Sequence, residues 1–226
     1  MKHIYFIRHG QTAKNKTRIH QGPDEPLTEL GKEQVRDVIA YLQDQKIDTL
    51  VSSNYLRAKQ TADMIGDALG LPYTIEPSVR EFGRPNTLYG RHHFSPASVR
   101  YIFALYRERM NLLWDDDGAE NLAHIRERIR DARLMLEALP GERIAVVSHR
   151  IFMSMYTETV CYDKPLSLIK FVGGLVGHKR IPNTTVLHFI CEPTTHDHTC
   201  TWHLAETILP RYNGERPKNE KLKAQN

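Results

Sequence analysis

Short apolar runs alternate with amphipathic segments along most of the chain. Ile4 to Ile7 is a four-residue apolar run, too brief for a helix, that ends at Arg8-His9-Gly10. From Thr28 to about Gln45 apolar residues recur at helical spacing, and Ile47 to Val51 is a second short apolar run. The pattern predicts a buried strand, a helix and a second strand, in that order.

The same alternation continues into the middle of the chain. We expect a helix from Ser52-Ser53, which would cap it, to about Leu69, because Gly70 follows as a stop signal. Ser95-Pro96 indicates another helix start. The apolar face of that helix is expected to consist of Val99, Ile102, Phe103, Tyr106, Met110 and Leu113. Residues 82–117 interrupt the alternation and are predicted to form a small helical cap insertion.

The second half of the chain contains the clearest amphipathic helix. A capping-box spacing from Asp117 to Glu120 precedes it, and Pro140-Gly141 ends it. The strands expected after it run from Ile144 to Val147, from Thr184 to Cys191 and from Cys200 to Leu204, with a helix through Val160 after the first.

Strands separated by helices favour a parallel sheet that is covered on both faces. The sequence therefore predicts a three-layer α/β/α sandwich with a mostly parallel central sheet and the small helical cap insertion. Residues 1–210 are expected to form this single domain, and residues 211–226 a polar, basic, flexible tail. In such sheets ligands bind beyond the carboxyl ends of the strands, where both His9 and His149 fall.

Composition narrows the class of protein. The 226 residues suit one domain with an insertion, and 40% hydrophobic with 26% charged residues excludes wholesale disorder and fibrous proteins. The net charge of +4 is a mild excess that does not indicate a nucleic-acid partner. No apolar run approaches the length of a membrane span, so we expect a cytoplasmic protein with no membrane partner. The oligomeric state is not indicated.

The cysteines are too few for a disulfide framework in a chain of this length, and we expect reduced thiols. The late strands and their turn contain residue types that bind zinc, namely Cys191, His196, His198, Cys200 and His203. The two cysteines are symmetric about the turn, so a hairpin with Cys191 opposite Cys200 is favoured over a metal site.

Several cations are expected at one edge of the sheet. Arg8 and His9 follow the first strand, His149 follows a later one, and Arg57 lies early in the helix after the second strand. A histidine that attacks phosphorus must be neutral, and nearby cations favour the neutral imidazole while they hold phosphoryl oxygens. The edge is therefore predicted to be a phosphate pocket.

The block Arg8-His9-Gly10-Gln11-Thr12-x-x-Asn15 resembles the R-H-G-x-T-x-x-N signature of the histidine phosphatase superfamily, the phosphoglycerate-mutase-like group. Further blocks resemble the family's LTxxGxxQ, SSxxxRAxQTA and V(S/T)HG segments in the same order. These blocks are Leu27 to Gln34, Ser52 to Ala62 and Val147 to His149, and Pro182 to Val186 resembles a later family segment. The similarity spans about residues 3–190.

The resemblance implies that His9 is transiently phosphorylated and that Arg8, Asn15, Arg57 and His149 bind the phosphoryl group. It implies neither a metal nor a cofactor. The family usually draws its general acid from just past the next strand, where this chain has Glu81. Glu120, beside an acidic run, is an alternative that is more simply explained as a helix-capping residue.

Two departures from the family bear on activity. Arg150 stands where the family commonly has glycine after the second histidine, and the mutase segment ERHYGALxG is replaced from Glu81 onward by Glu-Phe-Gly-Arg-Pro-Asn. The expected function is therefore a metal-independent phosphomonoesterase acting on a phosphorylated small molecule. A phosphoglycerate-type mutase and a phosphate-ester-binding module without turnover are the alternatives. Cations of the insertion either contact an anionic substrate or form a solvated loop, namely Arg84, Arg91, His92 and His93.

Overall fold

The computed structural model describes residues 1–15, 17, 19–161, 165–176, 181–193, 200–210 and 219–220. The strands are β1 (Lys2–Arg8), β2 (Thr49–Ser52), β3 (Tyr73–Ile75), β4 (Arg143–Ser148), β5 (Val186–Pro193), β6 (Cys200–Ile208) and β7 (Asn219–Glu220). The α-helices are α1 (Glu29–Asp44), α2 (Leu56–Leu69), α3 (Pro96–Arg107), α4 (Leu122–Ala138), α5 (Arg150–Val160) and α6 (Leu168–Val176). Three short 3-10 helices are η1 (Ala13–Asn15), η2 (Pro77–Val79) and η3 (Asn86–Leu88).

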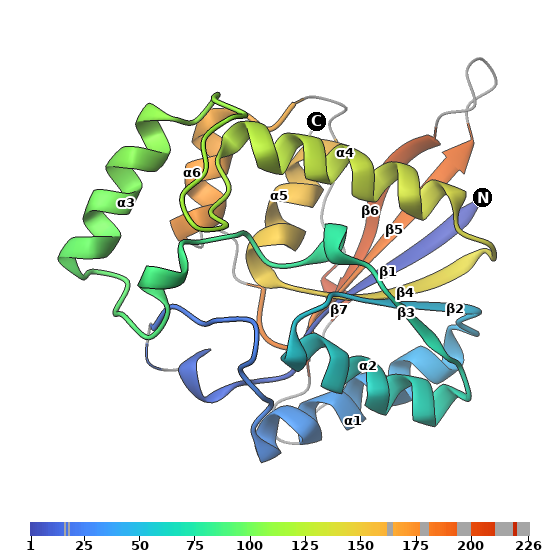
Figure 1. Ribbon diagram of the computed structural model, residues 1–226. Coiled ribbons are helices and arrows are strands. Elements are labelled where there is room, and N and C mark those ends of the chain that lie inside the picture. Colours follow the sequence, from blue (N-terminus) through green and yellow to red (C-terminus); the bar gives the residue numbers. More distant parts are fainter. Residues whose placement is uncertain are drawn as a thin grey trace.

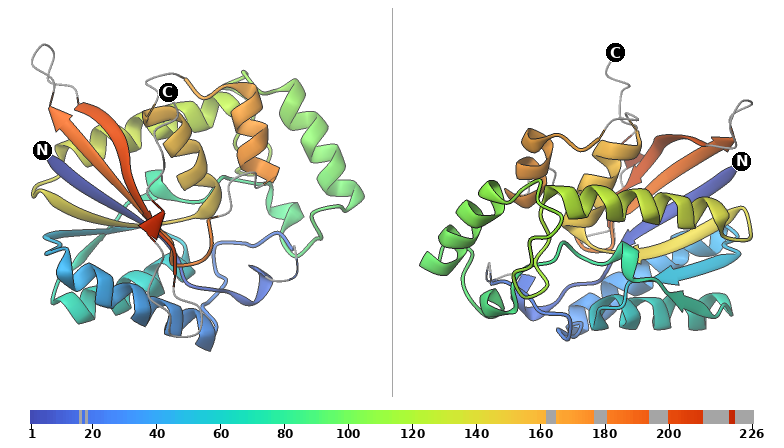
Figure 2. Two further views of the ribbon diagram at one scale, coloured as in Figure 1. Left: turned by 180° about the vertical axis from the view of Figure 1, so that it is seen from behind. Right: turned by 45° about the horizontal axis from the view of Figure 1, so that its top comes forward.

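These strands form one sheet in the order β3-β2-β4-β1-β5-β6-β7. The four strands β3, β2, β4 and β1 pair in parallel, and β5 to β7 extend the sheet in antiparallel fashion. Figures 1 and 2 show α1 and α2 on one face of the sheet and α4, α5 and α6 on the other. The predicted three-layer α/β/α fold is confirmed.

Both faces of the sheet are buried, which explains the short continuous apolar runs. Along β1, Ile4 and Phe6 join the hydrophobic cluster of α4 and α5, while Tyr5 and Ile7 join the cluster of α1 and α2. All four side chains are at most 1% exposed. The strand is thereby held from both sides up to the point where the chain turns toward His9.

Helix boundaries follow local capping, and two of the predicted caps are wrong. Tyr55 is the N-cap of α2 and offers no side-chain cap, so Ser52-Ser53 does not cap this helix. The N-cap of α4 is Asn121, whose capping box is formed with His124 instead of between Asp117 and Glu120. Helix α6 lies in a segment for which the sequence pattern predicted no element.

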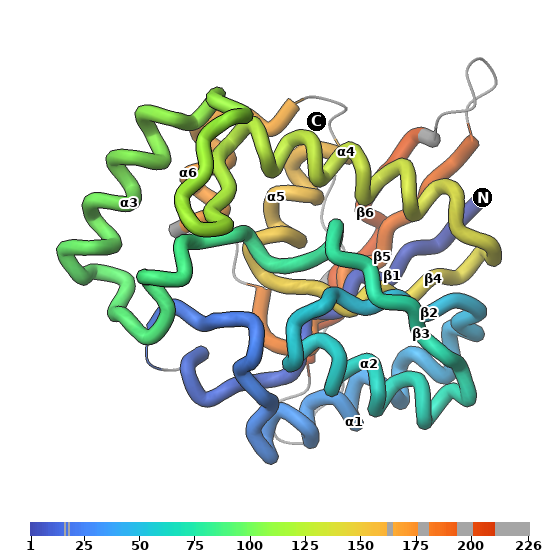
Figure 3. The backbone as a smooth tube through the Cα atoms, in the orientation of Figure 1, coloured from blue at the N-terminus to red at the C-terminus, as the bar shows by residue number. Residues whose placement is uncertain are grey.

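The cap insertion carries α3, which extends along the outer side of the molecule away from the strands (Figure 3). Ser95 caps α3 as predicted, through a hydrogen bond from Ser98 N. Tyr101 and Leu105 are the buried hydrophobic side chains of α3. The predicted apolar face is instead exposed, at Val99, Ile102, Phe103, Tyr106, Met110 and Leu113. The helical period was correct as far as Arg107, where α3 ends before Met110 and Leu113, but the side predicted to face the protein was wrong.

The late strands form the expected hairpin with a shifted register. In the strand register Cys191 lies opposite Trp202 and Cys200 lies opposite Pro193, so the two cysteines do not lie directly opposite each other as predicted. Cys191 is disulfide-bonded, contrary to the expectation of reduced thiols. His196 and His198 lie outside the described residues. Among the residues that the structure describes, no group of three or more His, Cys, Asp or Glu is arranged to hold a metal ion.

Two further expectations concern the C-terminal tail and membrane-spanning helices. The predicted flexible tail falls outside the described residues except for β7. No helix within the described ranges is long and apolar enough to cross a membrane.

Candidate active site

The parallel pairing of β1 with β4 brings the two site histidines together. Arg8 lies opposite Ser148 in the register, so His9 and His149 both follow paired strand ends. The two ring centroids are 5.1 Å apart, and the side chains are at most 2% exposed. His9 N also donates to Ser148 O at 3.1 Å, which fixes the turn after β1.

Hydrogen bonds assign the tautomer of His9. Arg57 Nε donates to His9 Nε2 at 3.2 Å, and His9 Nδ1 lies 2.7 Å from Gly10 O. Because guanidinium only donates and a carbonyl only accepts, Nδ1 carries the proton and Nε2 has the lone pair. Nε2 is therefore the nucleophilic atom, and it lies beside a cation.

The charge state of His9 follows from the same surroundings. Burial, together with Arg57 and Arg8, holds the pKa of His9 well below its usual 6.5. The imidazole is consequently neutral near pH 7, as attack on phosphorus requires.

His149 has one paired and one unpaired ring nitrogen. Its Nε2 lies 2.8 Å from Ser53 Oγ, and that oxygen already accepts from Tyr55 N. A hydroxyl can accept from that amide and also donate to Nε2, an arrangement that leaves the proton of the ring on Nδ1. Nδ1 is buried and has no hydrogen-bond partner among the described residues. A phosphoryl oxygen beside His9 would satisfy it.

The turn that carries His9 packs directly on the first turn of α1. A Cβ on Gly10 would overlap Gly31 O, and a Cβ on Gly31 would overlap Gln11 O. Gln34 Oε1 accepts from Gln11 N at 3.0 Å, so this side chain of α1 also holds the turn. The two motif glycines thus permit a backbone contact that positions the nucleophile.

Asn15 and the segment before β5 support the turn from the other side. Asn15 ends η1, and its Oδ1 accepts from Thr12 N at 3.0 Å and from Asn183 Nδ2 at 3.2 Å. Asn183 Nδ2 also donates to His9 O at 2.9 Å. Asn15 is therefore connected to the nucleophile through one shared amide.

Glu81 is held by the N-terminus of α5. Its Oε1 accepts from Phe152 N at 3.2 Å and from Phe82 N at 3.0 Å, and its Oε2 accepts from Ile151 N at 3.4 Å. His149, the N-cap of α5, makes no side-chain cap of its own, so Glu81 supplies the missing acceptor.

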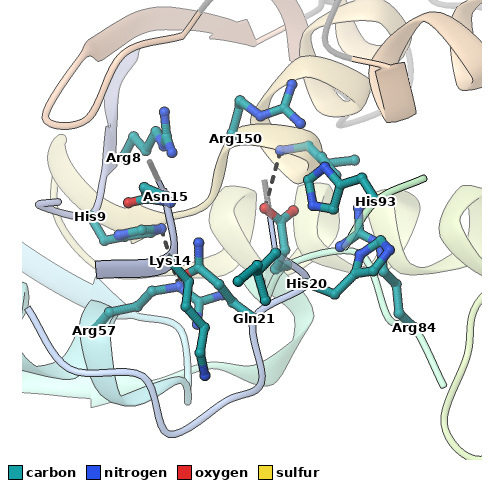
Figure 4. A pocket seen from close by; sticks show the side chains of 13 residues that line it. Arg8, His9, Lys14, Asn15, His20, Gln21, Arg57, Arg84, His93 and Arg150 are labelled. Atoms are coloured by element: carbon teal, nitrogen blue, oxygen red, sulfur yellow. Dashed lines mark hydrogen bonds between the residues drawn. The ribbon is translucent and has the colours of Figure 1, made fainter. Parts of the chain in front are cut away.

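These residues surround one cavity of about 170 Å³ (Figure 4). Five of the six predicted site residues line it, namely Arg8, His9, Asn15, Arg57 and Glu81. His149 does not line the cavity and lies next to His9 instead. Of the insertion's predicted cations, Arg84 and His93 line the cavity, whereas Arg91 and His92 do not.

Sequence reasoning missed three polar lining residues, Lys14, His20 and Gln21, and two apolar ones, Ile19 and Ile151. Lys14 lies in η1, and His20 and Gln21 lie between η1 and α1, where no hydrophobic period and no motif position marks them. Tertiary contacts hold His20 and Gln21 there: the His20 backbone pairs with Arg91 and Gly90 of the cap insertion, and Gln21 accepts from Thr12 Oγ1 at 2.8 Å.

Glu120, the alternative acid, has a different place. It is 5% exposed, accepts from Arg128 at 2.6 and 2.7 Å and from Arg80 at 3.1 Å, and does not line the cavity. Burial raises the pKa of the carboxyl, but the two arginines more than offset this and lower it. Glu120 is therefore a buried ion-pair partner, and the predicted capping role is also wrong.

Comparisons with known proteins identify the family. A family model of the histidine phosphatase superfamily (branch 1) matches residues 4–172. Proteins named probable phosphoglycerate mutase GpmB, from Yersinia pestis and Yersinia pseudotuberculosis, are 42% identical over 82 residues. That match covers 36% of this chain and 38% of theirs, so it spans well under half of these relatives.

Solved structures share the fold over most of the chain. A mycobacterial glucosyl-3-phosphoglycerate phosphatase has a TM-score of 0.68 at 21% identity and covers 90% of this chain and 97% of its own. A putative α-ribazole-5'-P phosphatase from Escherichia coli has a TM-score of 0.68 at 22% identity, covering 90% and 96%. At this level of identity the likeness shows the fold alone.

Proposed function

The chain belongs to the histidine phosphatase superfamily, and we propose that it is a metal-independent phosphomonoesterase that hydrolyses a phosphorylated small molecule through a phosphohistidine on His9. One observation carries this proposal. The lone pair of His9 Nε2, a guanidinium at 3.2 Å and the Glu81 carboxyl group meet at the same cavity.

In the first step Nε2 of His9 attacks phosphorus, and the bond to the ester oxygen breaks. Glu81 acts as the general acid and transfers a proton to that oxygen, so the substrate leaves as a neutral alcohol. Arg57 exchanges its contact with Nε2 for a phosphoryl oxygen, and Arg8 and the Nδ1 proton of His149 hold the others. These donors supply the charge stabilisation that phosphoryl transfer requires without a metal ion.

In the second step water attacks the phosphohistidine. The Glu81 carboxylate takes a proton from that water as its oxygen bonds to phosphorus, and the bond from phosphorus to Nε2 breaks. Inorganic phosphate leaves, and His9 returns to the neutral tautomer that the Gly10 carbonyl favours. Glu81 is then protonated again for the next ester.

A phosphoglycerate-type mutase is the second candidate, because relatives with 42% identity over 82 residues are named probable mutases. Against it, the segment after Glu81 lacks the ERHYGALxG pattern expected of mutases. Several structural neighbours are named phosphatases, which favours hydrolysis.

The test measures inorganic phosphate released from a panel of phosphomonoesters in the presence of a chelator, with isomerisation of 3-phosphoglycerate assayed in parallel. We expect chelator-resistant release that falls at least about 10⁴-fold in His9→Ala, because the nucleophile is removed. His203→Ala, an exposed histidine on β6 that does not line the cavity, is the matched control and should retain activity. Isomerisation without release would replace the phosphatase by the mutase, and activity in His9→Ala would remove both.

A further inference from the structure

The cavity contains more positive charge than one phosphoryl group needs. Its described lining includes the cations Arg8, Lys14, Arg57, Arg84 and Arg150 but only one carboxylate, that of Glu81. Lys14 is paired with Glu25 at 2.7 Å. A phosphomonoester brings about two negative charges, which Arg8 and Arg57 beside His9 match. Arg84 and Arg150 are therefore left with the single carboxylate of Glu81 between them.

The two remaining arginines lie away from the nucleophile. In Figure 4, His9 and Arg57 are on one side of the cavity, Arg84 is on the opposite side with His20 and His93, and Arg150 lies above. Within the described part of the chain, neither Arg84 nor Arg150 takes part in an ion pair or a side-chain hydrogen bond.

The position of Arg150 is unfavourable for folding. It is the first residue of α5, where the partial positive charge of the helix N-terminus repels a cation. Burial and the nearby Arg84 lower the pKa of its guanidinium, and Glu81 offsets part of this effect. A cation kept at such a place indicates a role in binding rather than in stability.

His20 provides an independent observation at the same end of the cavity. It is 7% exposed, its Nε2 lies 3.0 Å from Ser98 Oγ, and its Nδ1 is buried with no hydrogen-bond partner among the described residues. Burial, Arg84 and the two neighbouring histidines His93 and His92 lower the pKa of His20 to about 3. A buried imidazole nitrogen is thus left unsatisfied beside Arg84.

From this arrangement we propose that Arg84, Arg150 and His20 form a subsite for a second anionic group, so that the preferred substrate is a small phosphomonoester that also carries a carboxylate or a second phosphate. The proposal deepens the proposed function and rests on it for the place of the scissile phosphate. The two anionic groups would share one cavity of about 170 Å³, which favours a small molecule. Arg84 and Arg150 supply fixed charge, and neutral His20 can donate from Nδ1 in the tautomer whose Nε2 accepts from the Ser98 hydroxyl.

The test measures equilibrium binding by calorimetry in the His9→Ala background, which removes turnover from the measurement. The probes are glycerol 3-phosphate, 3-phosphoglycerate and propane-1,3-diol bisphosphate, which differ in the group opposite the phosphoryl end. We expect 3-phosphoglycerate, the bisphosphate or both, which have an anionic group at each end, to bind at least about tenfold more tightly than glycerol 3-phosphate. Whichever of the two binds better identifies the second group as carboxylate or phosphate.

Variants locate the preference. The affinity ratio is that of the tighter-binding probe with two anionic groups to glycerol 3-phosphate. Arg150→Gln and Arg84→Gln should each reduce this ratio at least about threefold, and Arg150→Lys should retain part of it. Arg100→Gln, an exposed arginine on α3 that does not line the cavity, changes the net charge equally and should leave the ratio as it is. Equal affinity for all three probes, or a ratio that Arg150→Gln and Arg84→Gln do not change, would overturn the subsite. Loss of the proposed function would appear separately, as absence of phosphate release by the unmodified protein.

Discussion

At the scale of single residues, the same groups hold the site ready and later stabilise the reaction. Arg57 donates to His9 Nε2 in the structure, which fixes the reactive tautomer before any ester binds. Its second contact, from Nη1 to Gly22 O at 2.8 Å, holds the guanidinium while the first contact is exchanged for a phosphoryl oxygen. The nucleophile is therefore oriented at little cost when the substrate enters.

Glu81→Gln tests the proton-transfer role. Glutamine keeps an oxygen that can accept from the amides of Phe152 and Phe82, so α5 remains capped, but it has no proton to give. We expect kcat with glycerol 3-phosphate to fall by about 10²- to 10⁴-fold. With 4-nitrophenyl phosphate, whose leaving group needs no protonation, the phosphorylation step should fall much less. Rapid-quench measurement of the phosphohistidine checks this, and equal losses for both esters would contradict an acid role.

At the scale of elements, α4 positions the segment that carries Glu81. Arg128 Nη1 donates to Ser78 O and to Arg80 O, both at 2.8 Å, while its Nε and Nη2 hold Glu120. Glu120 in turn accepts from Gly83 N at 2.7 Å. One buried ion pair thus spans the backbone on both sides of Glu81.

Arg128→Lys is expected to lower activity through the position of Glu81. Lysine keeps the charge but cannot bridge Glu120 and two carbonyls, so the loop loosens, and a shift of about 1 Å can cost up to about 100-fold. We expect kcat to fall about tenfold or more with glycerol 3-phosphate and less with 4-nitrophenyl phosphate. The free energy of unfolding should fall by about 1–3 kcal/mol, measured in urea.

The matched control is Arg126→Lys on the same helix. Arg126 Nε and Nη2 both donate to Leu166 O, at 2.9 and 2.6 Å, so this substitution also removes a two-donor contact, but away from Glu81. It should lower stability without changing the ratio of activities toward the two esters. If both variants change that ratio equally, Arg128 acts only through stability.

Elements with strong local signals could be predicted from the sequence, and those set by packing could not. Thr28 accepts from Gly31 N and Gly70 adopts a φ of 67°, as capping rules indicate for α1 and α2. The side of α3 that faces the protein depends on contacts with distant elements, so its period alone gave the wrong face. The site histidines were predictable because both follow strands, whereas His20 reaches the cavity only through the tertiary contact of two loops.

At the scale of the whole molecule, the sheet order creates the site. Strands β1 and β4 are far apart in sequence but adjacent in space, and β2 lies next to β4, so three strand ends deliver His9, His149 and Ser53 to one edge. Figure 1 shows the loops of the cap insertion reaching the same edge from the α4 side. Each group belongs to a different segment, and the fold must be intact for the cluster to exist.

The fold also buries histidines in their neutral form. Burial is the first cause of a lowered pKa at His3, His9, His20, His149 and His188, with values of about 3 for His20 and about 4 for His188. In the unfolded chain each imidazole binds a proton below its ordinary pKa of about 6.5. The unfolded state then holds more protons, so stability falls as the pH falls below about 6.5 and these groups have little effect above it.

His188→Gln tests this acid instability. His188 stacks on Tyr5 at a centroid distance of 4.4 Å and contacts His3 through Nε2, far along β5 from the turn that carries His9. Each buried histidine contributes a loss of up to about 1.4 kcal/mol per pH unit, and for His188 the loss continues down to about pH 4. The free energy of unfolding, measured in urea, should fall between pH 7.5 and pH 5.5 by about 1 kcal/mol less in His188→Gln than in the unmodified protein. If His188→Gln shows the same change between the two pH values as the unmodified protein, acid instability has another origin.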